Sequence, residues 1–151
     1  MEPIGHKARV FGMVFLLANR LQLLGDQMDP GMTTKQWLLV AGVLRCGNEA
    51  PALSEVAAQI GSSRQNVKKM AVILARRGFV AMERDRDDAR VVRIRLTEAC
   101  LAHLRQRDGI ERRFLEALFA GCAPGELAAL SGGMEKLLKN LAEMGNGDAE
   151  A

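Results

Sequence analysis

The chain has 151 residues, of which 48% are hydrophobic and 26% charged, and its net charge is +3. This composition excludes a disordered polymer and suits one compact domain with added helices. The longest apolar run, near residues 11–18, is shorter than the roughly 20 residues that span a bilayer. We also expect no secretory signal. The chain is therefore predicted to be cytoplasmic, with no membrane partner.

Basic residues gather in the middle of the chain. Residues 62–95 include ten basic and four acidic side chains, so this segment has a charge of +6. The remaining residues together have a charge of −3. A local basic field indicates an anionic polymer as partner, most often nucleic acid.

Two helices are predicted in the first third of the chain. Apolar residues recur at mostly helical spacing over residues 6–28. Asp-Pro-Gly at residues 29–31 then interrupts the pattern. Thr33 or Thr34 is expected to cap a second helix that ends near Cys46.

Two more helices follow in close succession. The first is predicted over Leu53–Ile60 and ends at Gly61, which can adopt a positive φ angle. The second opens at Ser62, which we expect to form a capping box with Gln65, and it stops at Gly78. Its inward-facing residues are expected to be Val67, Met70, Ala71 and Leu74.

A protruding β-hairpin is predicted next. Residues 79–84 and 90–96 have strand patterns, and the second alternates with a period of two. In the polar run between them, we expect Asp88 to orient a neighbouring arginine. Arg86 or Arg90 would then be exposed to a narrow minor groove of DNA.

A long helix begins near Thr97, and a last helix has an apolar seam. The seam residues are spaced by 3, 4, 3, 4 and 3 positions: Leu127, Leu130, Met134, Leu137, Leu141 and Met144. Such spacing is typical of helices that pair. Packing within one chain is the alternative, and self-association is the favoured interpretation.

The order of helix, short helix, turn, helix and hairpin is that of a winged helix-turn-helix, whose second helix enters the major groove. We predict a mainly α fold. The winged helix-turn-helix lobe, with a two-stranded β-hairpin wing, covers residues 33–97. N- and C-terminal dimerisation helices cover residues 1–32 and 98–151.

The predicted DNA-binding residues lie on the second helix of the pair and on the hairpin: Ser62, Ser63, Arg64, Gln65, Asn66, Lys68, Lys69, Arg86, Asp88 and Arg90. The serine hydroxyls and free N–H groups at the helix start suit a phosphate. Gln65 and Asn66 can bind adenine bidentately, and Arg64 can bind guanine. Two alternatives stay open: the helix face could be merely solvated, and Arg90 could pair with Asp88 for structure first.

These motifs resemble the MarR family of transcriptional regulators. The most specific element is Asp88-Ala89-Arg90, followed by an alternating strand that ends in Leu96-Thr97. The resemblance implies a homodimer that binds double-stranded DNA at a pseudo-palindromic operator. It also implies that a small-molecule effector or an oxidant changes the spacing of the two DNA-binding lobes. Lys69 stands where this family usually has an arginine, so the charge is kept and the planar fork is lost.

Other functions find little support. Cys46, Cys100 and Cys122 are expected to be buried, inert thiols. The two histidines are far apart in sequence, so no metal is predicted, and no cofactor. The sequence has no Gly-rich phosphate loop and no nucleophile elbow, so an enzyme is not expected.

We therefore predict a homodimeric transcriptional regulator, with a repressor as the favoured sign of regulation. The alternative is a winged-helix protein-interaction module that does not bind DNA. Methionines and Trp37 are candidates to line an apolar effector pocket between the helical and DNA-binding lobes.

Overall fold

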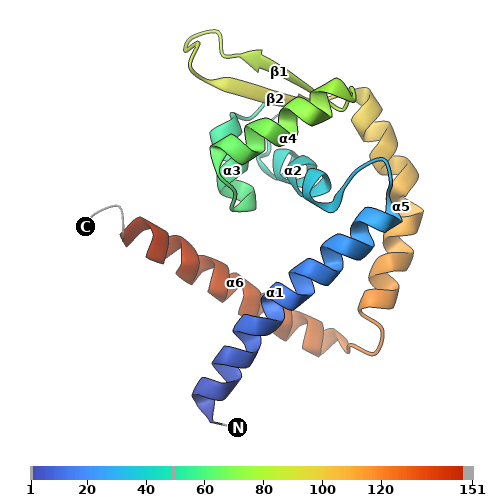
Figure 1. Cartoon of the computed structure of the whole chain (residues 1–151), viewed down its shortest axis with the longest axis vertical. Helices are drawn as coiled ribbons and strands as arrows, with labels where there is room; N and C mark the ends of the chain where they lie inside the picture. Colours follow the sequence, from blue (N-terminus) through green and yellow to red (C-terminus); the bar gives the residue numbers. More distant parts are fainter. Residues whose placement is uncertain (1, 49, 148–151) are drawn as a thin grey trace. The chain divides into compact units, whose positions relative to one another are not determined.

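The computed structural model describes residues 2–48 and 50–147. Its elements in chain order are α1 (Pro3–Met28), α2 (Thr34–Arg45), α3 (Leu53–Ile60), α4 (Arg64–Arg76), β1 (Val80–Arg84), β2 (Val92–Leu96), α5 (Glu98–Leu118) and α6 (Pro124–Gly147) (Figure 1). The chain divides into two compact units, residues 1–111 and 112–151. The predicted mainly α winged helix-turn-helix is confirmed.

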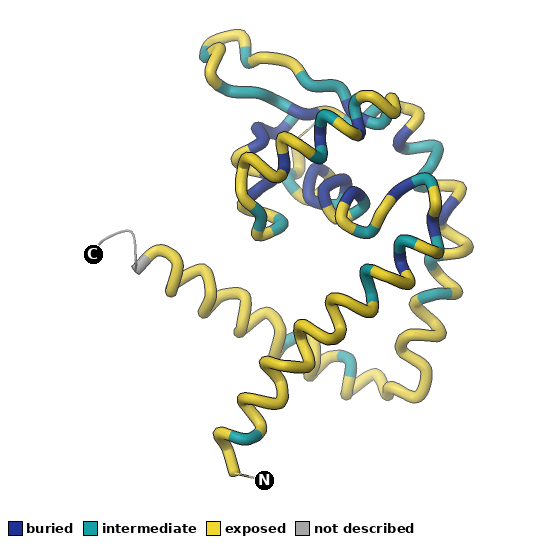
Figure 2. The backbone as a smooth tube through the Cα atoms, in the orientation of Figure 1, coloured by how far each residue is buried: buried dark blue, intermediate teal, exposed yellow. Residues whose placement is uncertain are grey.

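The hydrophobic core of the first unit lies between α2, α3, α4 and the hairpin. Leu39, Val56, Leu74 and Ile94 have no exposed surface, and each comes from a different one of these elements. Figure 2 shows these buried segments in dark blue. Burial of one apolar face per element is what holds the short helices in place, because helices of 8 to 13 residues are marginal alone.

The start of α2 is capped as predicted. Thr33 Oγ1 accepts a hydrogen bond from the Gln36 backbone N–H at 3.2 Å, and the Thr33 N–H donates to Gln36 Oε1 at 3.0 Å. This reciprocal capping box satisfies two N–H groups that the helix itself cannot pair.

The turn between α3 and α4 corrects one prediction. Ser63 is the N-cap of α4, where its Oγ accepts from the Asn66 N–H at 3.1 Å, and the predicted capping box of Ser62 with Gln65 is wrong. Gly61 has a φ of 65°, and the Ser62 N–H donates to the Ala57 carbonyl at 3.1 Å. Ser62 is therefore used to close α3, and the cap moves one residue along.

The hairpin forms an antiparallel pair in which Val80 lies opposite Leu96 and Arg84 opposite Val92. Figure 1 shows it extending beyond α3 and α4. Both strands begin later than predicted. At the second, the cause is a closed tip, in which the Asp85 N–H donates to the Val91 carbonyl at 2.9 Å. This wing is tied to the core through Ile94, whose N–H donates to the Pro51 carbonyl.

One carboxylate organises the tip of the wing. Asp85 Oδ2 accepts from the N–H groups of Asp87 and Asp88, both at 3.1 Å, and Oδ1 accepts from Arg93 Nε at 2.6 Å. Arg93 Nη1 also donates to the Ala50 carbonyl at 3.0 Å. The Arg93 guanidinium and the two N–H groups hold the pKa of Asp85 below its ordinary value. Arg93 thus joins the tip to the loop before α3.

Helix α1 exposes much of its apolar surface. Phe11 is 69% exposed and Phe15 is 58% exposed, and their rings form an edge-to-face pair with centroids 5.1 Å apart. The apolar character extends beyond the run at residues 11–18, because an 18-residue window of α1 has a mean hydropathy of 1.2. By length and composition alone, α1 could therefore cross a membrane. Only 6% of that window is buried.

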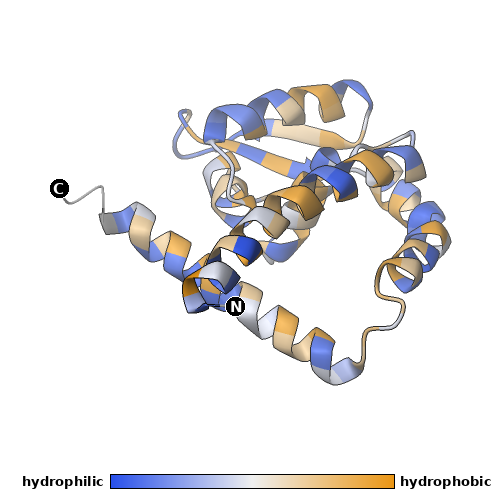
Figure 3. Cartoon of the chain, turned by 60° about the horizontal axis from the view of Figure 1, so that its bottom comes forward, coloured by the Kyte–Doolittle hydropathy of each residue, from blue (hydrophilic) through white to orange (hydrophobic). Residues whose placement is uncertain are grey.

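The second unit also exposes apolar side chains. Along α6, Leu138, Leu141 and Met144 are all at least 60% exposed. Figure 3 shows hydrophobic residues recurring along this helix. A helix that is apolar on a water-exposed face is typical of an interaction surface.

The cysteines only partly follow their prediction. Cys100 is buried and Cys46 is half-buried, and burial raises the pKa of both thiols. Cys122 is exposed, so its predicted burial is wrong. It follows Gly121, which has a φ of 81°, in the turn between α5 and α6, where no helix face is available to bury it.

The anchoring of the wing tip can be tested with Arg93→Ala. We expect faster amide hydrogen exchange at Asp87 and Asp88, because the substitution removes the partner of Asp85 and the link to Ala50. Arg95→Ala is the matched control: Arg95 is in the same strand, and its ion pair with Glu83 is longer (3.5 Å) and exposed. Equal protection of the tip in both variants would contradict the anchoring role.

Candidate nucleic-acid interface

Helix α4 has two distinct faces. Val67, Ala71 and Leu74 are fully buried on one side and pack in the core. Met70, which was also predicted to face inward, is only half-buried. The exposed side has a run of polar and basic residues near the helix start: Arg64, Gln65, Asn66, Lys68 and Lys69. The predicted recognition helix thus presents these side chains to solvent, while Ser62 is half-buried in the turn before it.

Arg64 has a specific contact that its position in the sequence does not indicate. Its Nη2 donates to the backbone carbonyl of Arg90 at 3.2 Å. Both arginines line a shallow pocket with Ser54 at the start of α3. Arg64 therefore connects α4 to the loop at the tip of the wing in addition to being exposed.

The predicted pairing of Asp88 with a neighbouring arginine is present. Arg90 Nε donates to Asp88 Oδ1 at 3.1 Å, and Arg90 Nη2 donates to Oδ2 at 3.2 Å. The Arg90 side chain and backbone N–H hold the pKa of Asp88 below its ordinary value. The Arg90 side chain is still 90% exposed, so the pair orients the guanidinium rather than burying it.

Arg86 lies at the tip of the wing and is exposed. Within residues 2–48 and 50–147, no hydrogen bond or ion pair of its side chain is found. Asp85 and Arg93, which shape this tip, were missed by the sequence prediction. The alternation of Arg93 with Ile94 indicated a strand of the hairpin. It did not indicate that Arg93 pairs with Asp85.

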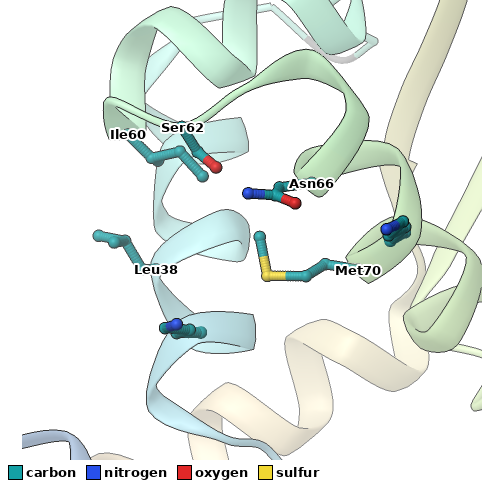
Figure 4. A pocket seen from close by; sticks show the side chains of 7 residues that line it. Leu38, Ile60, Ser62, Asn66 and Met70 are labelled. Atoms are coloured by element: carbon teal, nitrogen blue, oxygen red, sulfur yellow. The ribbon is translucent and has the colours of Figure 1, made fainter.

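A pocket of about 450 Å³ lies beside the recognition helix (Figure 4). Leu38 from α2, Ile60 from α3 and Met70 from α4 give it an apolar wall. Its polar lining residues are Lys35, Ser62, Asn66 and Lys69. Trp37, a predicted pocket residue, does not line this pocket and lies instead under the guanidinium of Arg107, 5.5 Å from the ring centre.

In the part of the chain that the structure describes, no three or more His, Cys, Asp or Glu side chains gather in a group that could hold a metal ion.

Solved structures share this architecture, although no family model matches the chain. A MarR protein from Peptoclostridium difficile has a TM-score of 0.79 and 19% identity, over 89% of this chain and 88% of that chain. The PcaV transcriptional regulator from Streptomyces coelicolor, in complex with its natural ligand, has a TM-score of 0.72 and 22% identity, over 92% and 93%.

A third similar structure contains DNA. It is a MarR mutant from E. coli complexed with operator DNA, with a TM-score of 0.74 and 18% identity, over 91% of this chain and 98% of that chain. At these identities the likeness is one of fold. The chain has the winged-helix fold of the MarR-type transcriptional regulators.

Proposed function

We propose that this protein is a homodimeric, sequence-specific DNA-binding transcriptional regulator that acts as a repressor in the cytoplasm. One observation carries the proposal: the exposed face of α4, which is free of acidic side chains and stands beside a wing that exposes Arg86 and Arg90. Residues 62–77 include five basic residues and no acidic residue. The similar fold that was solved with operator DNA supports this function.

In this proposal the start of α4 enters the major groove. Ser63 and the free N–H groups of the first turn bind a phosphate, which the helix dipole also favours. Gln65, Asn66 and Lys68 reach base edges or neighbouring phosphates from the exposed side of the helix. Lys69 contributes a point charge where a planar guanidinium would give bidentate contact.

The wing reaches the minor groove in the same complex. Arg86 is the better candidate to enter it, because its side chain has no hydrogen bond or ion pair to give up among residues 2–48 and 50–147. If Arg90 entered the groove, its hydrogen-bonded partner Asp88 would enter with it, and the DNA phosphates would repel the Asp88 carboxylate. Asp88 therefore positions Arg90 near the backbone, and Arg86 is inserted.

The exposed apolar faces of α1 and α6 are covered by a second copy of the chain. Burying apolar surface contributes roughly 25 cal/mol per Å², and phenylalanines such as Phe11 and Phe15 supply large areas. Pairing also serves DNA binding, because two linked lobes add their half-site energies through effective concentration. A protein-interaction module is the alternative, but the charge of the α4 face favours DNA.

The effector, in this proposal, is a small anion with an apolar body that binds the pocket beside α4. Two ammonium groups, from Lys35 and Lys69, flank an apolar wall that includes Leu38 and Met70. Because Asn66 and Lys69 also belong to the proposed DNA contacts, an occupied pocket competes with the operator. A regulator of this design needs no catalytic group.

DNA binding is tested by selecting sites from random duplexes and titrating the selected duplex with variants. Arg64→Ala, Gln65→Ala and Lys68→Ala should each weaken binding by about tenfold, since a good base contact is worth about 1–3 kcal/mol. Lys68→Ala should also reduce the salt dependence of log K by about one unit if it contacts a phosphate.

Lys136→Ala is the control, because it removes the same charge from an exposed position on α6. Unchanged affinity in all three α4 variants would contradict the placement of this helix in the groove. A binding constant that does not fall with added salt would contradict DNA binding by the basic segment.

Dimerisation is tested by sedimentation. The wild-type protein should sediment at twice the chain mass of 16.5 kDa, and Phe15→Asp should shift it toward one chain mass by placing a charge in the interface. Lys139→Asp, a charge change at a polar position of α6, should leave the dimer intact. Association of the wild-type protein with lipid vesicles, in place of dimerisation, would assign the apolar face of α1 to a membrane.

The effector pocket is tested with benzoate as the probe, at constant ionic strength. Millimolar benzoate should weaken binding of the selected duplex by the wild-type protein. It should have less effect on Lys35→Ala, because that variant loses one of the two cations beside the pocket. Benzamide has the same ring without the charge and is the control. Equal effects of both compounds would argue against an anion site.

A further inference from the structure

A buried ionic cluster lies at the end of α1, away from the proposed DNA contacts. Asp29, the C-cap of α1, is only 8% exposed. Its Oδ2 accepts from Arg107 Nη1 at 2.8 Å and lies 2.8 Å from His103 Nε2. Since an ionised carboxylate only accepts hydrogen bonds, His103 Nε2 is the protonated nitrogen of this contact. Two residues of α5 thus hold the end of α1.

Arg107 extends the cluster to α2 and along α5. It is only 8% exposed, and its Nε donates to Glu111 Oε2 at 3.0 Å. The guanidinium also lies over the ring of Trp37 in α2. A buried arginine with two carboxylate partners and an aromatic face has few alternative positions, because each movement would leave a charge without a partner.

The same loop is held from the other side by the end of the recognition helix. Arg77, the C-cap of α4, donates from Nη1 to the Gly31 carbonyl at 2.7 Å. Asp29 Oδ1 accepts from the Gly31 N–H at 3.0 Å. The His103 ring also contacts Phe79, which follows α4, with ring centres 5.2 Å apart. Residues 29–31 are therefore held by hydrogen bonds from both α5 and the end of α4.

The fit around this loop is close. A Cβ atom at Gly31 would lie 2.7 Å from His103 Cε1, so a larger residue would force the histidine away. Burial alone would raise the pKa of Asp29. The hydrogen bonds from His103, the Gly31 N–H and the Arg107 guanidinium lower this pKa by more than burial raises it, so the carboxylate stays ionised.

Stability does not account for such a cluster. A buried ion pair loses about as much in desolvation as it gains in attraction, and apolar packing would stabilise this region equally well. What directional hydrogen bonds add is a defined geometry. Here they define the geometry between the end of α1, residues 98–111 of α5 and the end of α4, all within the first unit.

We propose that four residues form a positioning junction: Asp29, His103, Arg107 and Arg77. This junction sets the angle between the recognition helix α4 and the pair of helices α1 and α5. This inference rests on the proposed function. In the dimer, that angle determines the distance between the two recognition helices. The junction therefore selects the spacing of half-sites that the protein binds, through geometry rather than through contacts with bases.

The first test uses the selected duplex and versions of it with one base pair added or removed between the half-sites. The wild-type protein should prefer the selected spacing. Asp29→Asn keeps the shape of the side chain and removes its charge, and it should reduce this preference by about fivefold or more. Arg77→Ala should act in the same direction, because it breaks the link from α4 and leaves the buried pair in place.

Two control variants separate positioning from stability. Glu98→Gln removes an exposed ion pair of α5, with Arg105, outside the junction. Val56→Ala destabilises the core without contacting the junction. Both should keep the wild-type spacing preference. If Asp29→Asn and Arg77→Ala weaken binding equally at every spacing, as Val56→Ala does, the positioning role is overturned.

A second measurement needs neither DNA nor a dimer. Spin labels at Arg20→Cys in α1 and Arg76→Cys in α4, in a Cys46→Ala and Cys122→Ser background, report the distance between the two helices within one chain. Labelled chains are diluted with unlabelled chains. The distance distribution should be narrow in the parent and in Glu98→Gln, and broader or shifted in Asp29→Asn and Arg77→Ala.

The two measurements distinguish the possible failures. A narrow, unshifted distance in Asp29→Asn overturns the junction itself. A broadened distance with an unchanged spacing preference overturns its role in half-site selection. Absence of any duplex binding by the wild-type protein would overturn the proposed function, while the distance measurement would still decide the role of the junction.

Discussion

The burial of one side of α4 is the constraint on which the rest of this structure depends. Val67, Ala71 and Leu74 recur at helical spacing and pack in the core, which leaves the opposite side in solvent. Fully burying an aliphatic side chain stabilises a fold by about 1.5–3 kcal/mol, whereas exposed charges add little. The apolar side therefore fixes the orientation of α4, and the basic side remains available for a polyanion.

Two of the ionic pairings in the first unit differ in their physical character. On the wing, Asp88 and Arg90 are exposed, so their pairing restricts orientation and adds little stability. At the end of α1, Asp29 and Arg107 are buried, where an unpaired charge is strongly unfavourable. The exposed Arg90 side chain can therefore reorient toward a bound partner, whereas the buried groups around Asp29 are restricted to few geometries.

The apolar surfaces of α1 and α6 are the second feature that constrains this molecule, because they favour association. The exposure of Phe11, Phe15 and Leu138 to water gives the chain a strong hydrophobic reason to associate. In our proposal, association and DNA recognition use separate surfaces. They are coupled mechanically, through α1 and α5, because the Asp29 junction joins both helices to the end of α4.

The sequence by itself determined the order of the elements, a threonine cap at the start of α2, most of the buried side of α4 and the pairing of Asp88 with a neighbouring arginine. These features depend on interactions within a few residues, which periodicity and capping rules describe. Ser63 replaced Ser62 as the cap because the end of α3 had already used the Ser62 N–H. The tertiary structure alone decided the contacts of Asp29, whose partners His103 and Arg107 lie 74 and 78 residues away. No local pattern encodes such pairs, since they form only when packing of the apolar faces brings distant helices together.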